Sequence, residues 1–162
     1  MDTYLGSKLL AAQPMTRQQY VTFRGWDLPA DENGEDEGML VEYLDGGKPN
    51  VPGHSGYISW SPMDVFNNAY RKINGLTFGL AIEAMRLEHR VARSGWNGKG
   101  MFIYLVPAAS YPAQRGAAHA WAGPDAMIPY GPYIAMKTVD GTVVPWLASQ
   151  TDVLAEDWNI VT

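Results

Sequence analysis

One short segment carries residue types suited to binding a nucleotide: Arg90, Arg93 and Lys99 flank Trp96 and Asn97. Guanidinium and ammonium groups pair with phosphate oxygens, and an indole ring stacks on a base. An Asn amide reads a base edge or a ribose hydroxyl, and the glycines of the sequence GWNGKG let backbone amides approach an anion. The same pattern also fits an exposed basic hairpin around a core tryptophan, so spacing alone leaves both interpretations open.

A second group of candidates is the carboxylate cluster Asp152, Glu156 and Asp157 near the end of the sequence. Paired carboxylates can act as general acid and base, which would suit a cyclic-nucleotide hydrolase. Such residues can instead cap a helix or accept hydrogen bonds from a ligand. We favour these two roles, because sequence alone does not show that the carboxylates lie close enough for catalysis.

Other catalytic patterns are missing from the sequence. The three histidines, His54, His89 and His119, lie at no metal-ligand spacing, and there is no cysteine. There is no HExxH pattern, no phosphate-binding loop and no GxSxG elbow. The acidic run at 31–38 lacks the alternating acids of a calcium loop and reads as a solvated loop. We therefore predict no catalytic residue, no metal and no cofactor.

Composition excludes several further classes of protein. The chain has 162 residues, of which 46% are hydrophobic and 18% charged, as in globular proteins. Its net charge of -5 argues against binding to the DNA or RNA backbone. No apolar stretch approaches the roughly 18 residues of a membrane span, and the first residues lack the apolar region of a signal peptide. We expect a cytoplasmic protein without a membrane partner.

Two segments must position these residues, with Gly75 at their junction. In segment 1–75, Thr16 and Gln19 form a capping box that predicts a helix to about residue 23. Strands are predicted at 39–43 and 57–60. A second helix is predicted with Ser61 as its N-cap and a staple between Trp60 and Val65. Its predicted buried face comprises Val65, Phe66, Ala69 and Tyr70.

Segment 76–162 begins with one main helix, capped by Thr77, whose apolar residues recur with helical spacing from Phe78 to Met85. Strands are predicted at 90–93, 101–106, 133–138, 142–146 and 158–161, with a short helix or turn at 149–155. An insertion rich in Ala, Pro and Gly occupies 107–132. Antiparallel strands packed with one main helix predict an α+β fold, preceded by a small α+β segment.

The second segment resembles the second type of Thoeris anti-defence protein, a phage family. The resemblance lies in LTFGLAIEAM at 76–85, RVARSGWNGKGMFIYLV at 90–106, PYIAMKTVDGTVVPWLASQTDVLAEDW at 132–158 and NIV at 159–161. It implies a compact α+β homotetramer that binds glycocyclic ADP-ribose, the messenger made by bacterial TIR-domain enzymes, without cleaving it. It also implies that some members bind cyclic dinucleotides of a second defence system. The protein would act in the infected bacterial host cell.

The resemblance also implies roles for individual residues. Phe78 and Trp96 would stack on the ligand, while Arg93, Asn97 and Lys99 would face phosphate or ribose. Hydrogen bonds from hydroxyls or the base would be accepted by Thr151, Asp152 and Asp157. Two departures from the family pattern are the insertion at 107–132 and segment 1–75, which minimal members lack. The alternatives are a hydrolase using Asp152 and Asp157, and a phage structural or protein-interaction module.

Overall fold

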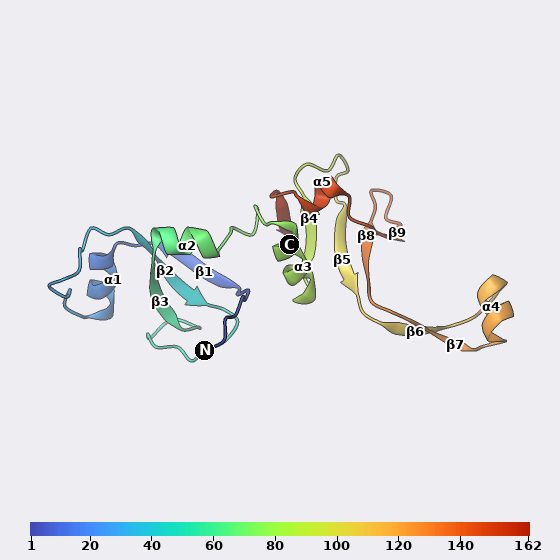
Figure 1. The fold of residues 1–162 in the computed structure, drawn as a ribbon, viewed down its shortest axis with the longest axis horizontal. Coiled ribbons are helices and arrows are strands. Elements are labelled where there is room, and N and C mark those ends of the chain that lie inside the picture. The colour runs from blue at the N-terminus through green and yellow to red at the C-terminus, as the bar shows by residue number, and fades with distance from the viewer. The chain divides into compact units, whose positions relative to one another are not determined.

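The computed structural model describes residues 1–162 and divides them into two units, Met1–Arg71 and Lys72–Thr162 (Figure 1). The division falls a few residues before the predicted junction at Gly75. The separate roles predicted for the two segments stay a prediction. None of the helices has the length and apolar character that crossing a membrane requires.

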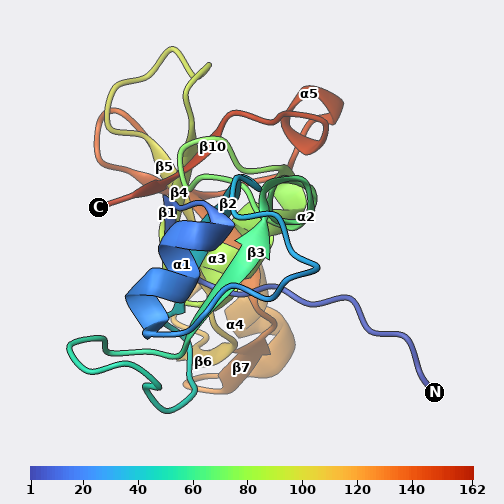
Figure 2. The ribbon, with the colours of Figure 1, turned by 90° about the vertical axis from the view of Figure 1, so that its left-hand side faces the viewer.

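The first unit is built on a three-stranded antiparallel sheet in the order β1-β2-β3. The strands are β1 Leu10–Pro14, β2 Gly38–Tyr43 and β3 Ile58–Pro62, and the helices are α1 Arg17–Arg24 and α2 Met63–Ala69. The predicted capping box is confirmed, since the Thr16 hydroxyl accepts from the Gln19 amide and the Gln19 side chain accepts from the Thr16 amide. Gly25 ends α1 with a φ of 68°, and Figure 2 shows this helix beside the sheet.

The predicted start of α2 is wrong, and its predicted buried face is wrong for Val65 and Ala69, whereas Phe66 and Tyr70 are partly buried with their ring centroids 5.0 Å apart. Strand β3 pairs with β2 through Pro62, so Ser61 lies in the sheet opposite Met39 and no side chain caps the helix. Val65 is 53% exposed and Ala69 is exposed as well. The predicted staple is absent because the Trp60 ring packs on the cluster of Tyr20, Leu40 and Ile58 instead, with its indole N–H donating to the Met15 carbonyl at 2.8 Å.

The second unit is a five-stranded antiparallel sheet, in the order β10-β4-β5-β8-β9, packed with one main helix. The strands are β4 Arg90–Arg93, β5 Phe102–Val106, β8 Tyr133–Lys137, β9 Val143–Pro145 and β10 Trp158–Val161; the helices are α3 Phe78–Arg86 and α5 Gln150–Val153. Thr77 caps α3 as predicted, accepting a hydrogen bond from the Leu80 amide. The fold is α+β, as the sequence predicts.

The core of this unit lies between α3 and one face of the sheet. Ala81, Ala84 and Met85 of the helix pack on Val91, Ile103 and Trp158, which are fully buried. The opposite face of the sheet carries Phe102 and Tyr104, which alternate with Ile103 along β5. The sheet thus has one face closed by α3 and one face that α3 does not cover.

Residues 107–132, for which the sequence predicts an insertion without assigned structure, form an arm. Strands β6 Ala109–Pro112 and β7 Met127–Tyr130 pair with each other, and helix α4 Gly116–Ala122 connects them. The arm continues from β5 and returns to β8, carrying α4 away from the sheet (Figure 1). We call residues 107–132 the arm below.

Candidate ligand-binding site

Arg93 lies between Asp152 and Asp157, two of the carboxylates that the sequence singles out. Arg93 Nε donates to Asp157 Oδ1 at 2.8 Å, and its Nη1 donates to Asp152 Oδ1 at 2.9 Å. Strand register explains the first contact, because Arg93 is paired with Trp158 and Asp157 directly precedes that residue. The capping box of α5 explains the second, since Ser149 hydrogen-bonds both the amide and the carboxylate of Asp152. We call these three residues the arginine clamp.

The clamp is fully ionised at neutral pH. The hydrogen bond from Arg93 is the main cause that lowers the pKa of Asp157, and the Gly95 amide contributes. Burial opposes ionisation of Asp152, but hydrogen bonds from Ser149, Arg93 and Trp96 outweigh it and lower its pKa to about 2. Hydrogen bonds to Asp157 and Asp152 raise the pKa of Arg93. The clamp therefore carries one net negative charge.

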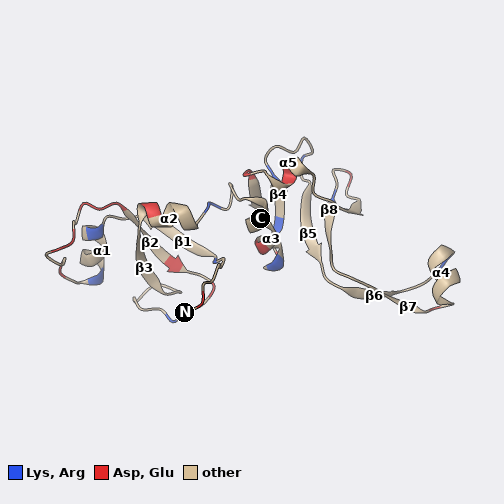
Figure 3. Cartoon of the chain, in the orientation of Figure 1, with Lys and Arg blue, Asp and Glu red and all other residues tan.

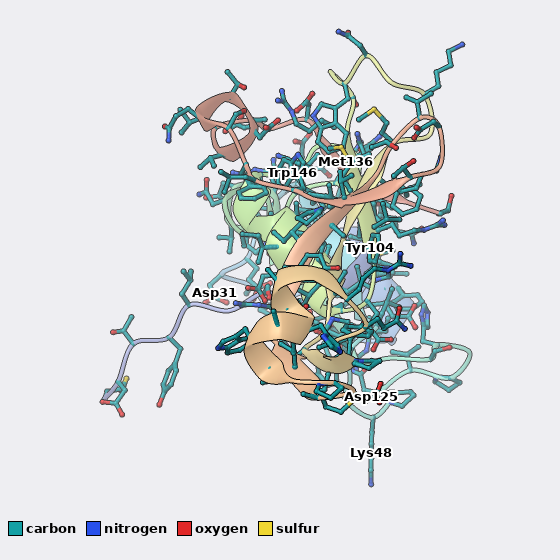
Figure 4. All side chains as sticks on the ribbon, turned by 90° about the vertical axis from the view of Figure 1, so that its right-hand side faces the viewer. Asp31, Lys48, Tyr104, Asp125, Met136 and Trp146 are labelled. Atoms are coloured by element: carbon teal, nitrogen blue, oxygen red, sulfur yellow. The ribbon has the colours of Figure 1, made fainter.

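Four aromatic rings gather beside the clamp. They are Phe78, Trp96, Trp146 and Trp158, which we call the aromatic cluster. Trp158 lies at the centre, with its ring centroid 5.3 Å from that of Phe78, 5.4 Å from that of Trp96 and 6.0 Å from that of Trp146. Trp158 is fully buried, whereas the other three rings are only partly buried. Figure 4 labels Trp146, which lies beside the end of the sheet away from the arm.

A hydrogen bond joins the aromatic cluster to the clamp. The Trp96 indole N–H donates to Asp152 Oδ1 at 3.4 Å, and the Trp158 indole N–H donates to the Asp152 carbonyl at 3.0 Å. The Asp152 carboxylate, which accepts a hydrogen bond from Arg93, thus also orients the Trp96 ring. Moving Arg93 or Asp152 would therefore disturb both the charges and the rings.

The remaining predicted residues lie on exposed segments next to the clamp. Asn97 and Lys99 are exposed on the 95–100 loop, which is anchored to the clamp by the Gly95 amide donating to Asp157 Oδ2 at 2.8 Å. Thr151 is exposed on α5, and its hydroxyl lies 2.8 Å from that of Ser149. Asn97 and Lys99 make no hydrogen bond or ion pair within the chain. Their roles in binding stay predictions.

Sequence reasoning missed two members of the aromatic cluster, Trp146 and Trp158. Both are tryptophans within the sequence VPWLASQTDVLAEDW, next to the predicted Thr151, Asp152 and Asp157. Their large aromatic side chains, so close in sequence to the predicted ligand-binding residues, could have indicated that both tryptophans belong to the site. The burial of Trp158 against α3 was not readable from local spacing, because the helix lies far away in the sequence.

The clamp is poorly suited to acid–base catalysis. A carboxylate with a pKa of about 2 is deprotonated at neutral pH and is a weak base, so Asp152 would neither donate nor accept a proton efficiently. Asp157 has a lowered pKa for the same reason, while Glu156 is exposed and outside the clamp. No three His, Cys, Asp or Glu side chains come together in a way that could hold a metal ion.

Comparison with known proteins covers this second unit. Residues 76–161 match the model of the Thoeris anti-defense 2-like domain. The chain is also similar to Thoeris anti-defense 2 of Bacillus phage SP01, with 40% identity over 86 residues, which span 53% of this chain and 94% of the relative. All eight predicted site residues lie within the matched range.

These two matches place the α+β unit in a class of phage anti-defence domains and support a role in phage anti-defence. The chain belongs to the Thoeris anti-defense 2-like family. The family name suggests a non-catalytic role. Residues 1–75 lie outside the matched range.

Proposed function

We propose that this protein binds a cyclic nucleotide immune messenger and sequesters it without cleaving it. Glycocyclic ADP-ribose is the proposed ligand, with cyclic dinucleotides as a further ligand class. The observation that carries the proposal is the arginine clamp, which joins a cation, two acceptors and a partly exposed Trp96 within the family-matched segment. The protein would act in the cytoplasm of the infected host cell, as a homotetramer, without nucleic-acid or membrane partners.

Charge decides which residues would meet the phosphates. The two clamp carboxylates already use Nε and Nη1 of Arg93, so only the remaining guanidinium hydrogens are free for a ligand. Lys99 is exposed and has no acidic partner, so its ammonium supplies the unneutralised charge that a pyrophosphate needs. Asn97 would add amide hydrogen bonds from the same loop. This division assigns phosphate binding chiefly to Lys99 and the outer edge of Arg93.

Bases and ribose hydroxyls would meet the other side chains. The partly exposed rings of Phe78 and Trp96 would stack on a base, which contributes about 1–3 kcal/mol per base. Ionised Asp152 and Asp157, with Thr151, would accept hydrogen bonds from ribose hydroxyls. Charge-assisted hydrogen bonds contribute about 1.5–3 kcal/mol each. Before the entropy lost on association is counted, such contacts cover the roughly -10 kcal/mol that a sub-micromolar dissociation constant requires.

The ionisation of the clamp supports binding without cleavage. Hydrolysis of a phosphate or glycosidic bond needs a group that holds a proton near neutral pH and another that removes one. Low pKa values keep both clamp carboxylates ionised, which makes them hydrogen-bond acceptors for a ligand that stays intact. A hydrolase would need its acid elsewhere in the chain.

Calorimetric titration of the full chain with glycocyclic ADP-ribose and with cyclic dinucleotides tests the proposal. We expect saturable binding, and we expect Lys99→Glu to weaken it at least tenfold because the substitution places a third acid at the phosphates. Arg86→Glu is the matched control, since it makes the same charge change at a residue outside the clamp, paired only with Glu83. Equal affinities for the two variants would remove Lys99 from the site.

A further inference from the structure

The two units carry very different charge. Residues 1–71 contain ten acidic and five basic side chains, whereas residues 72–162 contain seven of each. The whole net charge of -5 therefore lies on the first unit, which the family match does not cover. Figure 3 shows several of these acidic residues along the loop between α1 and β2. A protein that binds the first unit would gain from carrying basic residues.

The sheet of the first unit has two edges, and the edge at β3 is blocked at both ends. The Tyr43 amide donates to the Tyr57 carbonyl, so the backbone of the next residue, Ile58, faces away from β2. The Asn50 side chain takes up both of these groups, accepting from the Ile58 amide at 2.7 Å and donating to its carbonyl at 2.9 Å. Pro62, at the other end, has no amide hydrogen to offer.

The edge at β1 is open. The Met15 amide donates to the Gly38 carbonyl and the Leu9 carbonyl accepts from the Leu44 amide, so alternate residues of β1 face β2. The backbone groups of Leu10 and Ala12 therefore point outward, and no strand or side chain of the chain bonds to them. The strand, with the sequence LAAQP, also lacks the charged side chains that commonly prevent another strand from pairing at an edge.

A hollow lies beside this open edge. It has a volume of about 170 Å³ and is lined in part by Ala11, Leu40, Glu42 and His54. Ala11 is paired with Glu42 in the β1–β2 register, so both side chains are on the same face of the sheet. Only the small methyl group of Ala11 thus stands between the open edge and the Glu42 carboxylate.

Glu42 is prepared to accept a further hydrogen bond. Its Oε1 accepts from the Ser55 and Gly56 amides at 2.7 Å and 2.9 Å, and its Oε2 lies 2.9 Å from His54 Nδ1. The hydrogen bond from His54 is the main cause that lowers the pKa of Glu42, and the Gly56 and Ser55 amides contribute. The carboxylate is therefore ionised at neutral pH. Its Oε2 keeps a free lone pair, and the side chain is 20% exposed.

The position of the hollow favours a long cationic side chain. A strand added at β1 would lie about 4.8 Å from it, and Glu42 lies one strand further. Lys and Arg are long enough to cross β1 over Ala11 and place their charge at Glu42. Phe23 is 40% exposed, and its ring centroid lies 5.8 Å from that of His54, so an aromatic ring is available for the aliphatic stem.

We propose that β1 binds an extended basic segment of a partner protein, which adds to the sheet as an antiparallel strand and places one Arg or Lys over Ala11 against Glu42. The outward backbone groups of Leu10 and Ala12 supply the main-chain hydrogen bonds, and Glu42 selects the basic side chain. The site uses residues of the first unit alone. It therefore goes beyond the proposed function and does not depend on messenger binding.

Fluorescence anisotropy of a labelled peptide, Thr-Val-Arg-Val-Thr, with the full chain tests the backbone contacts. With Arg opposite Ala11, the first valine exchanges hydrogen bonds with Ala12, whereas the N–H of the Arg points away from β1. We expect saturable binding, and we expect N-methylation of that valine to weaken it at least tenfold. N-methylation of the Arg is the matched control and should change the affinity less than threefold. Failure to saturate, or equal losses from the two methyl groups, would overturn the proposal.

The charge contact is tested by removing each partner. Replacing the peptide's Arg by citrulline, which has a similar shape and no charge, should weaken binding to the full chain at least tenfold. Glu42→Gln should cause a similar loss for the Arg peptide and little change for the citrulline peptide. Glu35→Gln is the matched control, because it removes an exposed acid of the same unit outside the hollow. Equal affinities for the Arg and citrulline peptides would show that no basic segment is selected.

A variant at the edge itself gives an independent check. Ala12→Pro removes an outward amide hydrogen and leaves the hydrogen bonds between β1 and β2 in place, as Pro14 already does at the next outward position. We expect it to weaken binding of the Arg peptide at least tenfold while the circular dichroism spectrum stays unchanged. A folded variant with full affinity would place the peptide elsewhere. The methylated peptides test the same contact on the unaltered chain if this variant does not fold.

Discussion

Arg93 separates two carboxylates that would otherwise face each other, so its removal has a larger effect than loss of an ordinary surface ion pair. We expect Arg93→Ala to lower the free energy of unfolding by about 1–3 kcal/mol, less than for a fully buried pair because the side chain is 19% exposed. Arg86→Ala, which removes an exposed pair with Glu83, should cost less than about 0.5 kcal/mol. Denaturant unfolding of both variants measures the difference. Similar losses would mean that the clamp is not a structural feature.

The low pKa of Asp152 links stability to acid pH. The carboxyl has an ordinary pKa of 3.8 when unfolded and about 2 when folded, so its stabilisation is present above pH 4 and is lost as the pH falls toward 2. The shift corresponds to about 2 kcal/mol. Asp152→Asn should be less stable at pH 7 and show a flatter decline between pH 4 and pH 2. An unchanged slope, measured by unfolding across this range, would contradict the assigned pKa.

Trp96 is expected to be both a packing residue and a ligand contact. Trp96→Ala should weaken messenger binding by about 1–3 kcal/mol, roughly 5- to 150-fold, because one stacked ring is lost. Trp96→Phe keeps a ring and should retain most of the affinity. If the alanine variant is less stable but binds with unchanged affinity in calorimetry, the ring serves only the core.

The sequence indicated which residues belong to the candidate site, but it did not indicate which of them hydrogen-bond to one another. The clamp residues were all candidates from the sequence, but Arg93 is 59 positions from Asp152 and 64 from Asp157, so nothing local indicated that they pair with one another. The sequence assigned Arg93 to a ligand, whereas the strand register of β4 and β10 gives it two carboxylate partners first.

Among the structural elements, the 95–100 loop depends on glycine at one position. A Cβ on Gly98 would lie 1.9 Å from Met101 Sδ and 2.7 Å from a methyl group of Val139, so these side chains or the loop itself must shift. Gly98→Ala should therefore displace Asn97 and Lys99 and weaken messenger binding at least threefold. Gly79→Ala in α3 would place its Cβ in ordinary contact with Thr77 Oγ1, at 3.9 Å, and favours helix, so it should leave binding unchanged. Calorimetry on both variants compares them, and equal affinities would show that the loop does not contribute.

Local signals predicted helix starts where a side chain reaches the first turn, as at Thr16 and Thr77. The start of α2 was mispredicted for a long-range reason. Ser61 has the right type for a cap, but pairing of β3 with β2 holds it in the sheet. No strand or helix was predicted for the arm, because Ala, Pro and Gly give no strand pattern, and the pairing of β6 with β7 decides its structure.

For the whole molecule, the family match predicts that binding belongs to the second unit. Residues 72–162 alone should bind the messenger within about threefold of the full chain, since they contain the clamp, the aromatic cluster and the matched range 76–161. Parallel calorimetry of the two proteins, after checking that the shorter one is folded by circular dichroism, makes the comparison. A folded but non-binding second unit would assign part of the site to residues 1–71.

Capture followed by release tests directly whether the protein sequesters an intact messenger. The full chain is mixed with a limiting amount of glycocyclic ADP-ribose, filtered to separate free nucleotide, and then denatured by heat and filtered again. We expect a first filtrate without messenger and a second one containing it intact. Messenger left free in the first filtrate would contradict binding, and a cleaved product in either filtrate would contradict sequestration.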